Sequence, residues 1–321
     1  MRNLKVCVVH DGNLDEKREK MVKSVIKALS KKYNVIDLTF DENFISNVKN
    51  CDVVFNLSTS GGEDSRQLHV PAILDFLGIP YTGSSAVVHA ICLDKITTKI
   101  ILKHYGIRTP DFFRVDIDED VENTFERVNI EYPLIVKPSK EGSAVGLRKE
   151  SVVWNTRGLR RAVRWIHDEF KQPALVEEFI EGKELSVGIV GNGDDIEVLP
   201  ILEIDFSNLP DDVEKFYSYR VKNEIDHYLR YHCPARMDES IEKDVVKNCV
   251  DAYKVLGLRD YARMDVRIKN GEPYILEVNS LPLLVPVYSD ITKMAEKRGY
   301  GYGDFVMKIL ETAMKRAGLV G

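Results

Sequence analysis

The chain has 321 residues, with 45 basic and 51 acidic side chains and a formal net charge of −6. This length exceeds one average domain, so we expect two or three domains that share interfaces. Lys and Arg form no uninterrupted run of five or more, so the composition gives no reason to expect a nucleic-acid partner.

The apolar run at residues 4–9 is too short for the core of a signal peptide or for a membrane span. We therefore expect a cytoplasmic protein with no membrane partner. The chain has five cysteines without a short repeating spacing: Cys7, Cys51, Cys92, Cys233 and Cys249. Most of them lie in apolar contexts, which favours buried thiols over a disulfide framework or a zinc site.

In the first ninety residues, short β-branched runs alternate with amphipathic stretches. The pattern predicts strands at residues 5–9, 35–38 and 53–57 and helices at residues 15–29 and 67–77. The second helix ends at Gly78 and is followed by Pro80, which is a helix stop signal. Strands that alternate with helices predict a parallel sheet.

A helix is expected at residues 94–105, which places a change of domain near residue 90. Further on, the pattern predicts strands at residues 134–136, 174–179 and 185–190 and a helix at residues 159–170. The polar stretch at residues 206–232 is long for a structureless connection, so we expect it to act as a lid or binding loop. Strands and a C-terminal helix complete the chain.

The first motif that carries chemistry is an apolar strand that ends at Lys137 and continues into a loop with Gly142 and Gly146. Glycines allow backbone N–H groups to approach an anion closely, as polyphosphate binding requires. Because the lysine precedes the glycines, the motif is not a Walker P-loop. A surface hairpin with an incidental lysine remains the alternative for this motif taken alone.

The second motif is a pair of expected strands joined by an Asn-Gly turn. Period-two spacing places Arg263 and Asp265 on one face of the first strand, and Glu277 and Asn279 on one face of the second. Two carboxylates and an amide oxygen suit Mg²⁺ that bridges phosphates, and a neighbouring arginine can stabilise an anion. The alternative is an exposed charged face, although interleaved apolar residues indicate that the other face is core.

The third motif is residues 175–184, where an apolar strand runs into an acidic turn. Backbone donors and acceptors beside apolar side chains can hold an adenine, and Glu184 can accept hydrogen bonds from ribose hydroxyls. Acidic residues at a strand end are more often simply solvated. This interpretation therefore depends on the other two motifs.

With Leu93-Asp94-Lys95 upstream, these motifs resemble those of the ATP-grasp superfamily, and within it the D-alanine:D-alanine ligases. The likeness covers nearly the whole chain and also includes Gly61-Gly62-Glu63-Asp64, Gly78 to Ser84 and Tyr231 to Ala235. It implies an α/β fold, with α+β character in the ATP-grasp part. The implied domains are a parallel-sheet domain at residues 1–90 and two domains that sandwich ATP, at residues 91–180 with the phosphate loop and 181–321 with the lid and metal site.

The resemblance also implies roles for individual residues. Those expected to bind the nucleotide are Lys95, Lys137 and Lys222 at the phosphates, Glu141, Gly142, Ser143 and Ala144 in the covering loop, Glu177, Phe179 and Ile180 at the adenine, and Glu184 at the ribose. Those expected to bind two Mg²⁺ ions, for which Mn²⁺ can substitute, are Asp265, Glu277 and Asn279. Those expected to act in catalysis are Arg263, Lys222 and Ser143, with Arg263 stabilising the tetrahedral intermediate.

In the implied reaction, a substrate carboxylate attacks the γ-phosphate of ATP, and an amine then displaces phosphate from the acyl phosphate. The products are an amide, ADP and phosphate. The implied partners are small molecules, either amino acids or a short peptide, and a second copy of the chain, since members of the family often form homodimers.

The substrate-binding positions depart from the family pattern. Ser58 stands where a histidine is expected, Asn223 where a tyrosine follows the lid lysine, and Leu283 where a glycine is expected. Tyr288 lies near the place of a carboxylate-binding serine, and Glu16 is poorly spaced to replace the glutamate that binds the first ammonium group. A site that pairs with polar groups of its substrate loses affinity when those partners change.

Three functions therefore stay open at this stage. The first is a ligase of this family, either a divergent D-alanine:D-alanine ligase or a relative for other amino acids or a peptide. The second is a non-catalytic nucleotide-binding regulator, whose metal cluster would be incomplete, whereas all of its residues are present here. The third is a kinase, for which the sequence marks no base near an acceptor.

Overall fold

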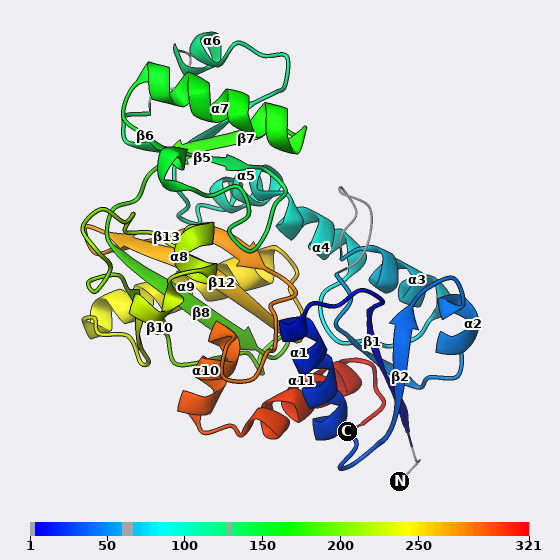
Figure 1. The fold of residues 1–321 in the computed structure, drawn as a ribbon. Coiled ribbons are helices and arrows are strands. Elements are labelled where there is room, and N and C mark those ends of the chain that lie inside the picture. Colours follow the sequence, from blue (N-terminus) through cyan, green and yellow to red (C-terminus); the bar gives the residue numbers. More distant parts are fainter. Residues whose placement is uncertain (1–3, 60–66, 127–129, 321) are drawn as a thin grey trace.

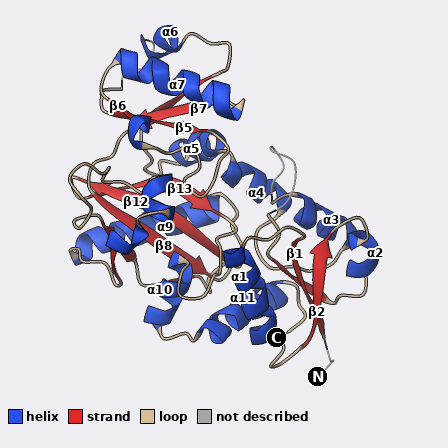
Figure 2. Cartoon of the chain, in the orientation of Figure 1, coloured by secondary structure: helices blue, strands red, loops and turns tan. Residues whose placement is uncertain are grey.

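The computed structural model describes residues 4–59, 67–126 and 130–320, which form three sheets with helices packed on them (Figures 1 and 2). The first sheet is parallel, in the order β2-β1-β3, as the alternating pattern predicted. Its elements are β1 (Lys5–Asp11), α1 (Glu16–Leu29), β2 (Asn34–Phe40), α2 (Phe44–Val48), β3 (Val53–Asn56), α3 (His69–Leu77) and α4 (Ala86–Leu93). Helix α3 ends at Gly78, which has a φ of 67°, so the predicted stop is confirmed.

The second sheet is antiparallel, in the order β4-β7-β5-β6. Its elements and the helices around it are α5 (Lys95–His104), β4 (Phe112–Val115), α6 (Val121–Glu126), β5 (Leu134–Pro138), η1 (Lys149–Ser151), β6 (Val152–Val153), α7 (Thr156–Phe170) and β7 (Ala174–Glu178). Helix α7 buries Leu159, Val163 and Ile166 against β5 and β7, and the side chain of Asn155 caps its start. Figure 1 shows this sheet as a separate layer above the rest of the molecule.

The third sheet has the order β11-β10-β8-β12-β13, with β9 beside β8. Its elements are β8 (Lys183–Val190), β9 (Glu197–Val198), β10 (Leu202–Asp205), β11 (Arg230–His232), α9 (Glu239–Val255), β12 (Tyr261–Lys269), β13 (Glu272–Asn279) and α10 (Asp290–Arg298). The Asn-Gly turn joins β12 to β13 as predicted, and α9 packs its apolar residues on the sheet. A β-bulge between Asp265 and Val266 shifts the register of the pair.

The polar stretch at residues 206–232 is more structured than the sequence suggested. It contains α8 (Tyr219–Asn223), η2 (Asp226–Tyr228) and β11, and its apolar residues form a small cluster of their own around Phe206 and Val221. The stretch is bonded to the neighbouring layer, because Tyr219 N donates to Leu147 O at 3.0 Å and Lys149 Nζ donates to Asp212 O at 2.8 Å. We refer to residues 206–232 as the lid segment.

The last helix, α11 (Tyr302–Arg316), returns to the first sheet and packs against α1 (Figure 1). One apolar core contains residues of β1, α1, α10 and α11 together, so the two ends of the chain share a core. Each of the three sheets lies within one of the expected domain ranges, and the division itself stays a prediction. None of the described helices is both long and apolar enough to cross a membrane.

The expectation that the cysteines are buried thiols is wrong for two of the five. Cys7 and Cys51 form a disulfide, with Cα atoms 5.8 Å apart. Cys7 lies on β1 and Cys51 precedes β3, so the parallel pairing of these strands brings together residues that are 44 positions apart in the chain. The other three cysteines are free, with Cys92 and Cys249 buried and Cys233 half-buried.

We predict that alkylation of the denatured protein without reductant modifies only Cys92, Cys233 and Cys249. After reduction, all five cysteines should react, and the loss of the cross-link should lower the free energy of unfolding by about 4 kcal/mol. Mass spectrometry of the alkylated chain and urea unfolding give the two measurements. Five reactive thiols before reduction would contradict the pairing.

Candidate functional site

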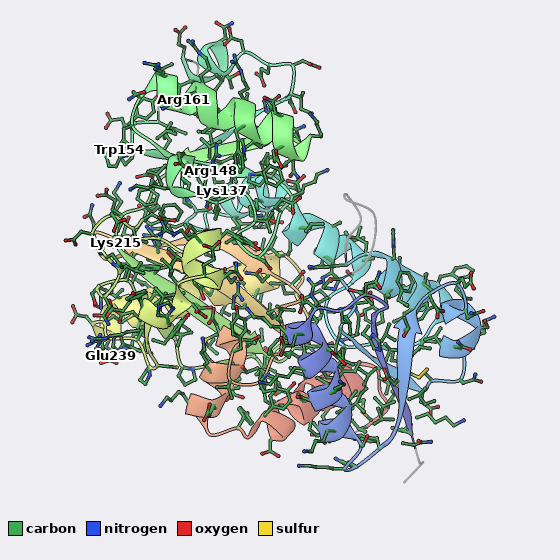
Figure 3. The ribbon with its side chains drawn as sticks, viewed as in Figure 1. Lys137, Arg148, Trp154, Arg161, Lys215 and Glu239 are labelled. Carbon is green, nitrogen blue, oxygen red and sulfur yellow. A yellow bond between two sulfur atoms is a disulfide. The ribbon has the colours of Figure 1, made fainter. Side chains whose placement is uncertain are left out.

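A small cavity of about 50 Å³ lies between the second and third sheets, beside the lid segment. Residues of β5, β7, β8, β12 and β13 line it. The rings of Phe179 and Phe216, which also line it, pack edge to face with their centres 5.9 Å apart. The cavity brings together five of the residues expected at a nucleotide: Lys137, Glu177, Phe179, Ile180 and Glu184. Figure 3 shows Lys137 at the junction between the two layers.

Glu177 is fully buried between two lysines. Its carboxylate accepts from Lys137 of β5, and its Oε2 lies 2.8 Å from Nζ of Lys99 on α5. Burial alone would raise the pKa of Glu177, but the charges of Lys137 and Lys99 lower it overall. Burial lowers the pKa of Lys99 to about 8, although Glu177 partly opposes the shift. The carboxylate is thus engaged on both sides, and the backbone of Glu177 lies in the middle of the sheet, opposite Phe112 of β4 and Ile135 of β5.

The phosphate loop after β5 is fixed by contacts that its sequence does not reveal. The Lys95 ammonium donates to the carbonyl of Glu141, and Gln172 accepts from Lys140 N at 2.7 Å while donating to Glu141 Oε1 at 3.1 Å. Ser143 and Ala144 have φ values of 56° and 62°, in the left-handed region. Non-glycine residues held in that region concentrate at functional sites.

Gly146 ends this loop at a position that no other residue fits. Its φ is 80°, and a Cβ atom there would lie 2.6 Å from Cγ of Pro138. The chain therefore turns back close against the end of β5 only because Gly146 lacks a side chain. Gly142, in contrast, faces open space.

The hairpin of β12 and β13 presents four polar side chains on one face, as predicted. Arg263 lies opposite Asn279, and Asp265 lies opposite Glu277. The Arg263 guanidinium donates to both oxygens of Asp265 at 2.9 Å, and Asn279 Nδ2 donates to Asp265 Oδ2 at 3.1 Å. Burial alone would lower the pKa of Arg263 and raise that of Asp265. The opposite charges of the pair outweigh burial, so the pKa of Arg263 is raised and that of Asp265 is lowered.

Two cations connect this hairpin to the other parts of the site. Nζ of Lys95 lies 3.8 Å from Oε1 of Glu277. Lys222 of α8 lies 5.1 Å from the ring centre of Tyr217, and burial together with the charge of Arg263 lowers its pKa. The loop after β5, the lid segment and the hairpin thus meet at one place, where Lys95, Lys222 and Arg263 lie close to Asp265, Glu277 and Asp290. No group of three or more His, Cys, Asp or Glu residues suited to a metal occurs within residues 4–59, 67–126 and 130–320.

The four residues at which the sequence is expected to depart from the family pattern all have contacts within the fold. Ser58 Oγ donates to Asp11 Oδ1, and the exposed Asn223 donates to the carbonyl of Tyr219 in its own helix. Leu283 packs on the apolar core, and the hydroxyl of Tyr288 accepts from Lys17 at 2.8 Å. The Gly61-Gly62-Glu63-Asp64 block lies outside the described residues.

Several residues of the site carried no signal in the sequence. They are Lys99 behind Glu177, Gln172 under the phosphate loop, Lys17 against Tyr288, and Arg267 beside Glu184. Lys17 and Lys99 lie on amphipathic helices, where lysine is common on the exposed face. Arg267 could have been found, because it continues the period-two series of Arg263 and Asp265 on β12.

Comparison with known proteins gives one consistent family. A family model described as "D-ala D-ala ligase C-terminus" matches residues 101–311. The chain is 31% identical to the D-alanine--D-alanine ligase of Carboxydothermus hydrogenoformans over 311 residues, which cover 93% of this chain and 95% of that protein. It is 34% identical to the corresponding ligase of Cupriavidus necator over 253 residues, which cover 78% and 72% of the two chains.

Among solved structures, the D-alanine--D-alanine ligase of Bacillus anthracis complexed with ATP is similar to this chain, with a TM-score of 0.79 and 27% sequence identity. The match covers 99% of this chain and 100% of that one. This likeness confirms the mixed α/β fold that was expected from the sequence.

We predict that Glu177→Gln destabilises the protein by about 3–5 kcal/mol, because it leaves two buried ammonium groups without their counter-charge. The neighbouring variant Glu178→Gln is the matched control, since Glu178 pairs with Lys269, whose side chain is 41% exposed. That variant should cost less than about 1 kcal/mol. Urea unfolding of both variants measures the difference, and equal stabilities would contradict the role given to Glu177.

Proposed function

The chain belongs to the D-alanine–D-alanine ligase family of ATP-grasp enzymes, and we propose that it uses ATP to join a carboxylate to an amine through an acyl phosphate. One observation carries this proposal. The Lys95 ammonium contacts the carbonyl of Glu141 in the phosphate loop and lies 3.8 Å from Glu277 on β13. A single cation therefore links the loop that covers the phosphates to the carboxylates that hold the metal.

ATP binds in the cavity between the second and third sheets, which we propose as two domains at residues 91–180 and 181–321. The adenine lies against the backbone after β7, near Phe179 and Ile180, and Glu184 faces the ribose. Lys95 and Lys137 bind the phosphates. The cavity of about 50 Å³ adjoins one of about 740 Å³, and the larger volume is that of an ordinary ligand site.

The hairpin face fits two Mg²⁺ ions, for which Mn²⁺ can substitute. Asp265 and Glu277 supply two carboxylates on opposed positions, and Asn279 adds an amide oxygen that is not used in its hydrogen bond to Asp265. Phosphate oxygens and water complete such a site, which explains why fewer than three carboxylates suffice. When bound, the ions neutralise charge on the transferred phosphoryl group.

The remaining catalytic roles fall to side chains of this chain. Lys222 of the lid segment reaches the transferred phosphate, and burial, together with the charge of Arg263, lowers its pKa. Arg263 stabilises the tetrahedral intermediate by donating to its oxyanion. Ser143 lies at the tip of the loop that closes over the reacting groups. A non-catalytic regulator is disfavoured because all four residues of the hairpin face converge.

We propose that the substrates are small molecules, either amino acids or a short peptide, and that D-alanine is a poor substrate. Ser58 donates its hydroxyl proton to Asp11, and Asn223 donates to the carbonyl of Tyr219 in its own helix, so contacts within the fold orient both side chains. Leu283 belongs to the core, and Tyr288 with Lys17 fills part of the acceptor side. A cytoplasmic location and a homodimer complete the proposal.

We predict that Glu277→Gln and Asp265→Asn each lower ATP turnover by at least about a hundredfold with the fold intact, because each removes a negative ligand of Mg²⁺. Glu272→Gln is the matched control, since this carboxylate lies on the same strand and pairs with the exposed Arg108. Phosphate release at saturating ATP is the measurement. Near-normal release by either site variant would remove the metal assignment.

We predict that ATP-dependent phosphate release requires two substrates and that the best pair is at least about a hundredfold more efficient than D-alanine alone. Two unmatched polar groups at about 1–3 kcal/mol each give a loss of this size. The assay is phosphate release across D- and L-amino acids, singly and in pairs, with mass spectrometry of the product. Efficient D-alanine dipeptide formation with no better substrate would overturn the specificity claim, and release without an amide product would overturn the ligase.

A further inference from the structure

Arg267 is a buried arginine on β12 for which the preceding account gives no role. Only 3% of its surface is exposed, and it lies two residues beyond Asp265, on the same face of the strand. It therefore continues the polar face of the hairpin from the phosphate end toward the adenine end of the cavity. Burial of an arginine requires that its donors be paired.

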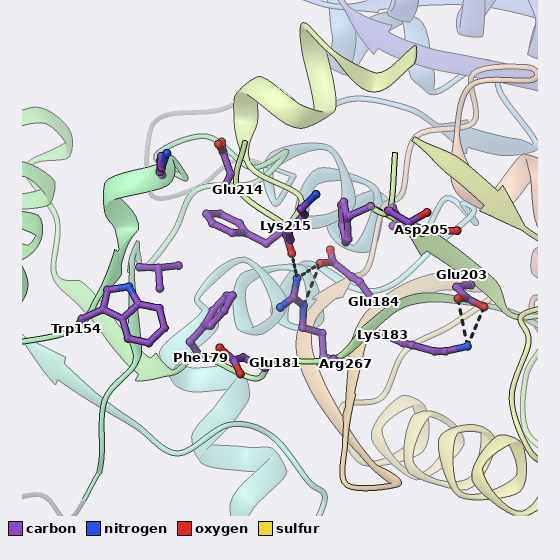
Figure 4. A pocket seen from close by; sticks show the side chains of 17 residues that line it. Trp154, Phe179, Glu181, Lys183, Glu184, Glu203, Asp205, Glu214, Lys215 and Arg267 are labelled. Carbon is purple, nitrogen blue, oxygen red and sulfur yellow. Dashed lines mark hydrogen bonds and ion pairs between the residues drawn. The ribbon is translucent and has the colours of Figure 1, made fainter. Parts of the chain in front are cut away.

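The guanidinium of Arg267 bonds to three separate parts of the chain. Nε and Nη2 donate to the same oxygen of Glu184, Oε2, at 3.1 and 2.7 Å. Nη1 donates to the carbonyl of Ile180 at 2.8 Å, and Nη2 also donates to the carbonyl of Lys215 at 3.1 Å. Figure 4 shows the contacts to Glu184 and Lys215 from one side of a larger cavity.

These contacts join the strand connection proposed for the adenine, the carboxylate proposed for the ribose, and the lid segment. The guanidinium also lies 5.1 Å from the ring centre of Phe179, so it packs on the aromatic wall of the cavity. Both bonds to Glu184 use Oε2, and within the described part of the chain Oε1 accepts no hydrogen bond, so it can accept from another donor. A planar guanidinium holds the carboxylate in one orientation, which an ammonium group cannot do.

Arg267 also stands between two cavities. The cavity of about 50 Å³ and a neighbouring one of about 740 Å³ share Phe179, Glu184, Phe216 and Arg267 in their walls. The larger cavity is of the size of an ordinary small-molecule site. A ribose next to Glu184 would therefore lie where the two cavities meet, within reach of the free oxygen of Glu184.

We propose that Arg267 is a positioning residue that sets the recognition of the ribose and couples it to the lid segment, an inference that rests on the proposed place of ATP. Through Oε2 it holds Glu184 so that Oε1 accepts a hydrogen bond from a ribose hydroxyl. Through the carbonyl of Lys215 it ties the lid segment to the same carboxylate. Nucleotides that lack a ribose hydroxyl are then held less well.

The test compares the wild type with Arg267→Met, Arg267→Lys and the control Lys269→Met. Lys269 lies on the same strand and face and also pairs with a glutamate, Glu178, but lines neither cavity. Calorimetry with Mg²⁺ and no amino acid measures the affinity for ATP, 2′-deoxyATP and 3′-deoxyATP. Kinetics then give KM for ATP and kcat, and circular dichroism with thermal melting checks the fold.

The wild type and Lys269→Met should bind at least one deoxynucleotide about tenfold or more weakly than ATP, which is the effect of one hydrogen bond to a charged group. In Arg267→Met the ratio of the dissociation constant for that deoxynucleotide to the one for ATP should fall to about two or less. The KM for ATP should rise about tenfold, and kcat should change by less than about threefold. Arg267→Lys should give an intermediate ratio, because it keeps the charge but not the planar donors.

A folded Arg267→Met with the wild-type ratio would overturn the inference. If that variant does not fold, a wild-type ratio in Arg267→Lys would overturn it equally. A wild type that binds both deoxynucleotides as well as ATP would show that Glu184 does not read the ribose. A wild type that binds no ATP would defeat the proposed function itself, whereas a negative amino-acid panel with normal ATP binding would leave the inference on Arg267 intact.

Discussion

The ion pair between Glu177 and Lys99 is the start of a chain of polar contacts that joins the second sheet to the third. Lys99 Nζ donates to Thr109 Oγ1 at 2.6 Å, and that hydroxyl donates to the carbonyl of Ile275 on β13 at 2.8 Å. A buried ionic contact in the second sheet is thus continued by hydrogen bonds to the third. Two ammonium groups face one carboxylate, so the cluster with Lys137 carries one uncompensated positive charge. An anion in the cleft would reduce that electrostatic cost, so the same cluster supports the phosphate contact that we propose for Lys137.

The pairing of β12 with β13 places four polar side chains on one face of the hairpin. Opposed positions of an antiparallel pair point to one side, so Asp265 and Glu277 need no loop to bring them together. The bulge next to Asp265 shifts the register, and Leu276 as well as Glu277 borders the site while Ile275 stays in the core. The face therefore changes along its length from carboxylates near the phosphate loop to Leu276 and Arg267 at the adenine end.

The sequence predicted those parts of the site that local periodicity determines. The hairpin face followed from period two and an Asn-Gly turn, and the strand that ends at Lys137 followed from its apolar run. Lys99 could not be predicted, because a lysine on an amphipathic helix is normally exposed and only the packing of α5 on β7 buries it. The Cys7–Cys51 disulfide also depended on strand order, which the cysteine spacing does not encode. The length of residues 206–232 predicted a lid or binding loop, which stays a prediction, and the short helix and small core of the segment required the tertiary contacts of Phe206 and Val221.

The two halves of the site also differ in how freely they can change. The nucleotide half is built on strands and on backbone groups, so a substitution there disturbs sheets that the whole fold requires. The half that we propose for the substrates includes the start of α1 and the loop after β13, which meet through Lys17 and Tyr288. Connecting segments tolerate substitution and carry specificity, whereas a buried pair such as Arg263 and Asp265 does not tolerate it. Such a division allows a chain to keep the phosphate chemistry of its family while its amino-acid contacts diverge, which is the arrangement that we propose here from the contacts of Ser58, Asn223 and Leu283 within the fold.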